Sequence, residues 1–177
     1  MPASLPLRLT SQRIQLRQWQ QQDLDAYAAL LADAETVRYI GHGQPYSRQE
    51  AWMNMAVLAG HWQLLGFGIW ALCARDSGEL LGRVGFIQPE GWPGLELAWL
   101  LKRSHWGQGL ASEAASLALN CARQHWPANT PIISLIHPHN QRSAKLAQRL
   151  GALPGEQVVM HGQPVECFFY PASATPS

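Results

Sequence analysis

The chain has 177 residues and a formal net charge of +1, with 47% hydrophobic and 14% charged residues. A charged share well below the usual ~25% in so apolar a chain excludes intrinsic disorder. The 13 Lys and Arg residues are scattered, so no basic stripe indicates nucleic-acid binding. The longest apolar run, residues 64–74, is too short for a membrane-spanning helix, which needs about 20 residues. Eight tryptophans are unusual, so we expect either that several of their rings line a site or that all of them are buried.

The N-terminal segment lacks the basic start and apolar block of a signal peptide. The three cysteines, Cys73, Cys121 and Cys167, are widely spaced, which favours reduced thiols and a cytoplasmic protein. No repeat or linker divides the chain. We therefore expect a single domain over residues 1–171, followed by a flexible tail over residues 172–177.

The first half of the chain combines strand and helix patterns. Period-2 alternation over residues 13–19 predicts an edge or near-edge strand. From Asp23, apolar residues spaced i, i+3, i+4 and i+7 predict a helix, and a capping box of Ser47 and Glu50 predicts the start of a second one. Three apolar segments joined by short loops predict neighbouring antiparallel strands: residues 66–74, 79–87 and 95–101.

The second half continues with helices and strands in alternation. The patterns predict a helix over residues 110–124, a short buried strand over 131–136, a helix over 140–150 that ends at Gly151, and a hairpin of residues 158–159 and 165–170. This order of elements predicts an α+β domain with a mixed sheet.

Gly107 and Gly109 lie in the loop between the predicted strand over residues 95–101 and the next helix. Glycine-rich turns at a helix start expose backbone N–H groups where the helix dipole is positive, which favours a pyrophosphate site. Glycines that only form a tight turn fit the pattern equally well. A P-loop is excluded because no Lys-Ser or Lys-Thr occurs, and the dinucleotide fingerprint lacks its third glycine, at Ser112, and its acidic residue, near Asn129.

The segment Trp106-Gly-Gln-Gly-Leu-Ala111 is similar to the acetyl-CoA signature of the GNAT acetyltransferase superfamily, Gln/Arg-x-x-Gly-x-Gly/Ala, with tryptophan at its first position. In chain order, residues 9–40, 78–86, 95–101 and 137–152 also resemble this superfamily, in the branch that includes the ribosomal-protein N-acetyltransferases. The resemblance implies a mixed, mostly antiparallel central sheet with helices on both faces. It also implies a splayed pair of strands that forms an acetyl-CoA cleft.

The same resemblance implies how acetyl-CoA, the acetyl donor, would be held. Its pantetheine would pair with the strand backbone beside the splay, its pyrophosphate would lie on the amides of the glycine loop, and Asn140 and Ser143 would face the pantetheine and the thioester. The implied cofactor-binding residues are Trp99, Leu100, Leu101, Trp106, Gly107, Gln108, Gly109, Leu110, Ala111, Ser112, Asn140 and Ser143.

Glu96 interrupts an apolar strand, so it is either an edge residue in water or a partly buried base. Burial would raise its pKa toward the range that is useful for deprotonating an amine, directly or through water. Ser143 lies on the apolar side of its predicted helix. The resemblance makes it the proton donor to the leaving CoA thiolate, whereas the alternative is a bond to its own helix backbone. Asn140 also fits a helix N-cap.

We therefore expect an N-acetyltransferase that transfers the acetyl group from acetyl-CoA directly to a primary amine, of a protein N-terminus or a small molecule, in a ternary complex. The alternative is a catalytically silent CoA-binding sensor or docking module, which CoA release with a panel of amines would distinguish. A nucleotide-binding regulator is disfavoured by the broken phosphate-loop patterns.

The acceptor side is less defined. Residues 39–46 and 88–94 are expected to flank the opening for the amine, with Trp70 and Trp92 in the acceptor pocket. His137 and His139 lack the further ligands of a zinc site, so no metal is expected, although either could relay a proton. No nucleic acid or membrane partner is expected, and a homodimer is the default assembly.

Overall fold

The computed structural model describes residues 3–160 and 162–172. Apart from Ala172, the expected tail lies outside these residues. Helices and strands follow in the order β1 (Leu9–Thr10), β2 (Ile14–Arg17), α1 (Leu24–Ala32), α2 (Ala34–Val37), α3 (Arg48–Leu65), β3 (Ile69–Ala74), β4 (Leu80–Ile87), β5 (Leu95–Leu101), α4 (Leu110–His125), β6 (Ile132–Ile136), α5 (Gln141–Arg149), β7 (Leu153–Met160) and β8 (Gln163–Tyr170). Within the described residues, no helix is long and apolar enough to cross a membrane.

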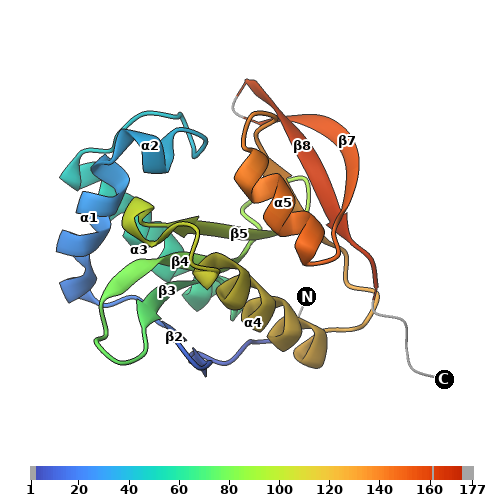
Figure 1. Cartoon of the computed structure of the whole chain (residues 1–177). Helices are drawn as coiled ribbons and strands as arrows, with labels where there is room; N and C mark the ends of the chain where they lie inside the picture. The colour runs from blue at the N-terminus through green and yellow to red at the C-terminus, as the bar shows by residue number, and fades with distance from the viewer. Residues whose placement is uncertain (1–2, 161, 173–177) are drawn as a thin grey trace.

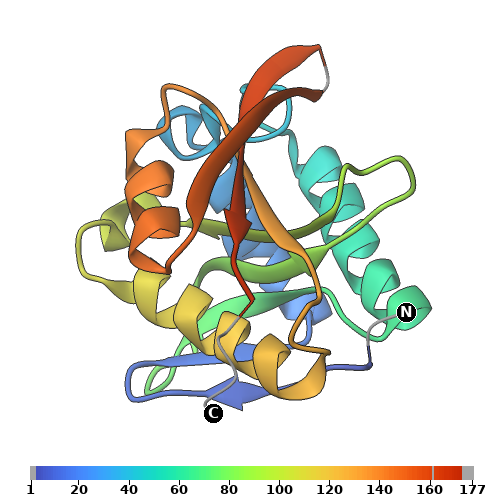
Figure 2. The same cartoon turned by 90° about the vertical axis from the view of Figure 1, so that its right-hand side faces the viewer.

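The strands form one sheet in the order β1-β2-β3-β4-β5-β6-β8-β7. Every neighbouring pair is antiparallel except β5 and β6, which run parallel. The predicted mixed, mostly antiparallel sheet is confirmed. Figure 2 shows the β7–β8 hairpin extending beyond the body of the sheet.

Helices cover both faces of the sheet, as expected (Figure 1). On one face, α4 and α5 pack through small side chains such as Ala118 and Ala147 against β2 to β6 and β8. On the other face, α1 and α3 pack through Leu31 and Leu58 against β3 to β5. The buried side of α4 consists largely of alanines, and the glycine loop before this helix connects it to β5.

The structure differs from the sequence-based elements mainly at their ends. Gly66, which we expected to begin a strand, ends α3 instead, with a φ of +74° and its N–H donating to the Trp62 C=O. The apolar run over residues 64–74 is therefore shared between a helix end and β3. The short elements β1 and α2 were not predicted. The first half of β7, which begins at Leu153, was not predicted either, because it is exposed and has no alternating apolar pattern.

Candidate active site

The sheet opens between β5 and β6. Only Leu95 with Ile132 and Glu96 with Ile133 form pairs between these strands. A continued parallel ladder would join the Leu97 C=O to the Leu135 N–H. Instead, Ser134 Oγ donates to the Leu97 C=O at 2.6 Å, so a side chain occupies the acceptor that the next ladder bond would use. The predicted splayed pair of strands is confirmed.

The backbone of β5 shows which residues face the opening. The C=O groups of Leu97 and Leu101 point to the β6 side, where Ser134 Oγ and Trp106 Nε1 donate to them. Because the directions of the backbone groups alternate along a strand, the N–H and C=O groups of Trp99 also point to the β6 side. The Leu100 backbone points to β4, where Leu100 pairs with Arg83. The expectation that the Leu100 backbone pairs with pantetheine is therefore wrong, since the neighbouring strand already occupies it.

The glycine loop has the geometry of an anion site. Gly107 and Gly109 both have a φ of +76°, a conformation that favours glycine, and Gly109 is the N-cap of α4 without a side-chain cap. The first backbone donor of this helix is Glu113, which bonds to the Gly109 C=O. The N–H groups of residues 107–112 donate to no residue that the structure describes. These amides lie at the positive end of the helix dipole and suit a phosphate.

Glu96 lies at the end of the β5–β6 ladder and is 8% exposed. Burial raises its pKa to about 7, although hydrogen bonds from Trp92 Nε1 and the Leu135 N–H and the charge of Arg83 act in the opposite direction. Trp92 Nε1 donates to Oε2 at 2.7 Å. A carboxyl group with this pKa exchanges a proton readily at neutral pH, which a general base requires.

Ser143 faces β5 from the first turn of α5. Trp99 Nε1 donates to Ser143 Oγ at 3.3 Å, and the Ser143 N–H donates to Asn140 Oδ1 at 3.2 Å. Asn140 is thus the N-cap of α5, as one of its two expected roles requires. The indole bond occupies an acceptor lone pair of the hydroxyl and leaves the O–H proton available.

Of the two tryptophans expected in the acceptor pocket, only Trp92 lies beside Glu96. Trp70 has no exposed surface: it packs edge-on against Trp62 with ring centroids 4.9 Å apart, and its Nε1 donates to the Pro6 C=O. Its assignment to the acceptor pocket is therefore wrong. The apolar strand on which it lies is buried on both faces, so its exposure could not be judged from its position in the chain.

Sequence reasoning missed two arginines at the glycine loop. Arg142 lies with its guanidinium carbon 4.4 Å from the ring centroid of Trp106, which places a cation at the position where the family signature has Gln or Arg. Arg13 contacts the loop from the β1–β2 turn. The departure at Trp106 was a signal for the first of these residues, whereas no local pattern pointed to the second.

The expected acceptor side contains an open groove of about 670 Å³ between residues 42–47 and α3. It is lined by His42, Tyr46, Ser47, Gln49, Glu50, Met53, Asn54 and Val57. Elsewhere in the same segment, the ring of Tyr39 stacks on His137 with centroids 4.9 Å apart, which joins the loop after α2 to the loop before α5. In the described part of the chain, no cluster of three or more His, Cys, Asp or Glu side chains suits a metal.

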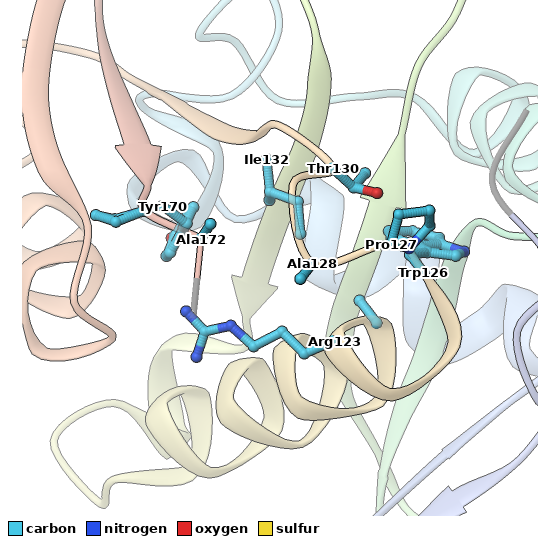
Figure 3. Close-up of a pocket in the computed structure, with 10 residues that line it drawn as sticks. Arg123, Trp126, Pro127, Ala128, Thr130, Ile132, Tyr170 and Ala172 are labelled. Atoms are coloured by element: carbon cyan, nitrogen blue, oxygen red, sulfur yellow. The ribbon is translucent and has the colours of Figure 1, made fainter. Parts of the chain in front are cut away.

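A separate, partly open pocket lies between the C-terminal end of α4 and the end of β8 (Figure 3). Its volume is about 20 Å³, which holds about one water molecule. Arg123, Trp126, Ile132 and Tyr170 are among its lining residues. This pocket is too small for any part of a cosubstrate, and neither Glu96 nor a residue of the glycine loop lines it.

A profile of the acetyltransferase (GNAT) domain matches residues 13–153, most of the chain. The chain belongs to the GNAT acetyltransferase family. This GNAT acetyltransferase superimposes on the crystal structure of an acetyltransferase from Agrobacterium tumefaciens with a TM-score of 0.80 and 26% identity, covering 96% of each chain. The expected family and fold are thereby confirmed.

Two further comparisons give a relative in sequence and a solved structure of the same fold. An uncharacterised N-acetyltransferase, p20, of Bacillus licheniformis is 28% identical over 141 residues, covering 73% of this chain and 79% of the relative. The structure of RimL, a ribosomal-protein α-N-acetyltransferase in complex with coenzyme A, matches with a TM-score of 0.72 at 16% identity, covering 94% of this GNAT acetyltransferase and 95% of RimL.

Proposed function

We propose that this GNAT acetyltransferase transfers the acetyl group of acetyl-CoA directly to a primary amine in a ternary complex. The observation that carries the proposal is the position of Glu96: a buried carboxyl group with a pKa of about 7 lies where β5 and β6 part. No comparable buried base is needed by a silent CoA-binding module. The binding of coenzyme A by RimL supports the same donor.

Acetyl-CoA enters the opening between β5 and β6 as a short additional strand. The outward-facing backbone of Trp99 and the N–H of Leu101, whose C=O already accepts from Trp106 Nε1, pair with the pantetheine, and the amides of residues 107–112 bind the pyrophosphate. Trp106 and Arg142 flank this phosphate site. Asn140 and Ser143 face the pantetheine and the thioester from α5.

Glu96 takes a proton from the acceptor ammonium group, directly or through water. The free amine attacks the thioester carbonyl, and outward-facing N–H groups of β5 stabilise the oxyanion. When the C–S bond breaks, the Ser143 O–H, whose oxygen accepts the Trp99 indole bond, gives its proton to the thiolate. As the amide forms, its nitrogen loses a second proton, which restores the Ser143 hydroxyl by way of solvent. Glu96 then releases the first proton to solvent, so that one proton is released in each turnover.

The acceptor is a primary amine of a protein N-terminus or a small molecule, and it reaches Glu96 past Trp92. RimL, which is named for acetylation of a protein α-amine, supports the first class. CoA release measured with a panel of N-terminal peptides and small amines tests the proposal. Absence of release with every amine, in a protein that binds CoA, would favour the silent module. The single domain over residues 1–171, the cytoplasmic location and the homodimer stay predictions.

Ser143→Ala is expected to lower kcat about 10- to 100-fold, because the thiolate then leaves without a positioned proton donor. The KM for acetyl-CoA should change little, since one hydroxyl group adds little to a ligand with many contacts. Steady-state kinetics measure both constants. Ser116→Ala, a partly buried serine in α4, is the matched control and should retain wild-type kcat. Equal kcat values for S143A and S116A would exclude Ser143 as the acid.

A further inference from the structure

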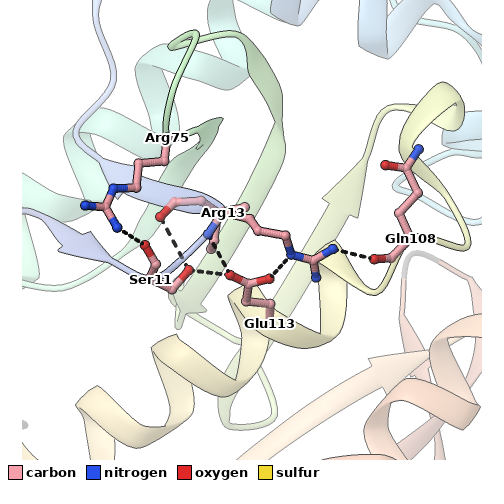
Figure 4. A network of polar contacts seen from close by, with 6 residues as sticks. Ser11, Arg13, Arg75, Gln108 and Glu113 are labelled. Carbon is pink, nitrogen blue, oxygen red and sulfur yellow. Dashed lines mark hydrogen bonds and ion pairs between the residues drawn. The ribbon is translucent and has the colours of Figure 1, made fainter.

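A polar network joins the turn between β1 and β2 to the glycine loop and the first turn of α4 (Figure 4). Arg13 Nε donates to Glu113 Oε2 at 2.7 Å, and Ser11 Oγ donates to Glu113 Oε1 at 2.6 Å. Arg13 Nη1 donates to the backbone C=O of Gln108 at 2.9 Å. One guanidinium group therefore contacts both the loop and the helix that follows it.

The bond to Gln108 fixes the direction of a peptide group in the loop. In a trans peptide the C=O and the following N–H point in opposite directions. Because the Gln108 C=O points to Arg13, the Gly109 N–H points away from the β1–β2 turn. This N–H is one of the amides of residues 107–112 that donate to no described residue. Arg13 thus orients a donor of the proposed pyrophosphate site.

Arg13 also compensates a charge that would oppose an anion. Glu113 lies in the first turn of α4, close to the loop amides. Partial burial alone would raise its pKa, but hydrogen bonds from Ser11 and from the backbone and side chain of Arg13 lower the pKa of Glu113 below its ordinary value. The carboxylate is therefore ionised at neutral pH and would repel a phosphate. The guanidinium at 2.7 Å neutralises it.

We propose that Arg13 is a positioning residue for the phosphate end of acetyl-CoA, which it serves by orienting the Gln108–Gly109 peptide and by neutralising Glu113. The inference rests on the proposed function and extends it to a residue of the N-terminal hairpin. Arg13 lies outside the reacting atoms, so its loss weakens donor binding and leaves the chemical step intact.

The test compares CoA binding by calorimetry and steady-state kinetics for the wild type, Arg13→Ala, Arg13→Lys, the double variant Arg13→Ala/Glu113→Gln, and Arg75→Ala. Arg75 is the matched control because it donates to the Ser11 C=O of the same turn without contacting the loop. R13A is expected to raise the Kd for CoA and the KM for acetyl-CoA about tenfold, with kcat unchanged. R13K should lose less CoA affinity than R13A, because lysine keeps the positive charge beside Glu113. It should still bind CoA more weakly than the wild type, because an ammonium group lacks the planar guanidinium that donates to both Glu113 and Gln108.

The double variant should regain part of the affinity that R13A loses, since the uncompensated carboxylate is gone, and R75A should bind CoA as the wild type does. A merely structural role would predict neither result. Wild-type affinity in both R13A and R13K, or a loss in R75A equal to that in R13A, would overturn the inference alone. Failure of the wild type to bind CoA would overturn the proposed function and this inference with it.

Discussion

Glu96→Gln is expected to lower kcat by about 10²- to 10⁴-fold, the usual contribution of a general base. In the wild type, activity should rise with pH through an apparent pKa of about 7, because only the ionised carboxylate accepts the proton of the amine. In E96Q this rise of activity near pH 7 should disappear. The residual rate should instead rise with the pKa of the free acceptor, about 8 for an α-amine or 10.4 for a lysine. Rate profiles from pH 5.5 to 9.5 with both kinds of acceptor measure this.

The same substitution should act on stability in the opposite direction. The folded-state pKa of about 7 lies above the ordinary value of 4.5, so the stability contributed by protonated Glu96 is fully present below pH 4.5 and is lost as pH rises through 7. At pH 8 the glutamine, which carries no charge, should make the protein roughly 3 kcal/mol more stable than the wild type. Chemical denaturation at pH 5 and pH 8 measures the difference.

These two effects separate catalysis from folding, because a variant that is more stable cannot lose activity through unfolding. Glu79→Gln is the matched control: Glu79 is a surface residue paired with Lys102, so its loss should leave the activity profile unchanged. A pH limb near 7 that persists in E96Q would remove Glu96 from the mechanism.

Trp70→Ala is expected to lower the free energy of unfolding by about 3–5 kcal/mol, because it empties a completely buried indole site in the core. The folded W70A protein should keep the wild-type KM for the acceptor and the wild-type pH dependence of activity. Denaturant titrations and kinetics well below the unfolding midpoint measure both quantities.

Trp92→Phe is the matched aromatic substitution at the site. It removes the indole donor that lowers the pKa of Glu96, so the activity limb should move to higher pH while stability changes far less than in W70A. A changed acceptor KM in the milder Trp70→Phe variant would contradict the assignment of Trp70 to the core.

The elements and the family could be predicted because their signals are local. The capping box of Ser47 and Glu50, the alternation before Trp19 and the glycine loop each depend on residues a few positions apart. The place of Glu96 in an apolar strand left two interpretations open, an edge residue in water or a partly buried base, and the structure shows that it is buried. The bond from Ser134 Oγ to the Leu97 C=O could not be predicted, because that contact exists only where two distant segments diverge.

Contacts between distant segments also explain the errors. Trp70 was expected on a central strand and Trp92 on a turn beside the cleft, and only the packing of α3 and of the chain near Pro6 shows that Trp70 is enclosed. Leu100 was expected to face pantetheine, but which edge a strand residue faces depends on the register with β4. Arg13 contacts the loop from about 95 residues before it, a separation at which no sequence spacing is informative, whereas the tryptophan at position 106 was the one signal for Arg142.

The alternating directions along β5 have a consequence for hydrogen exchange. The Leu100 N–H points to β4 and the Trp99 N–H to the open side, so two adjacent amides of one strand should exchange at very different rates in the free protein. CoA should slow exchange at Trp99 and leave Leu100 as it was. The Leu100 amide thus serves as an internal reference for the Trp99 amide. Comparing the exchange rates of both amides with and without CoA would show on which edge of β5 the ligand lies.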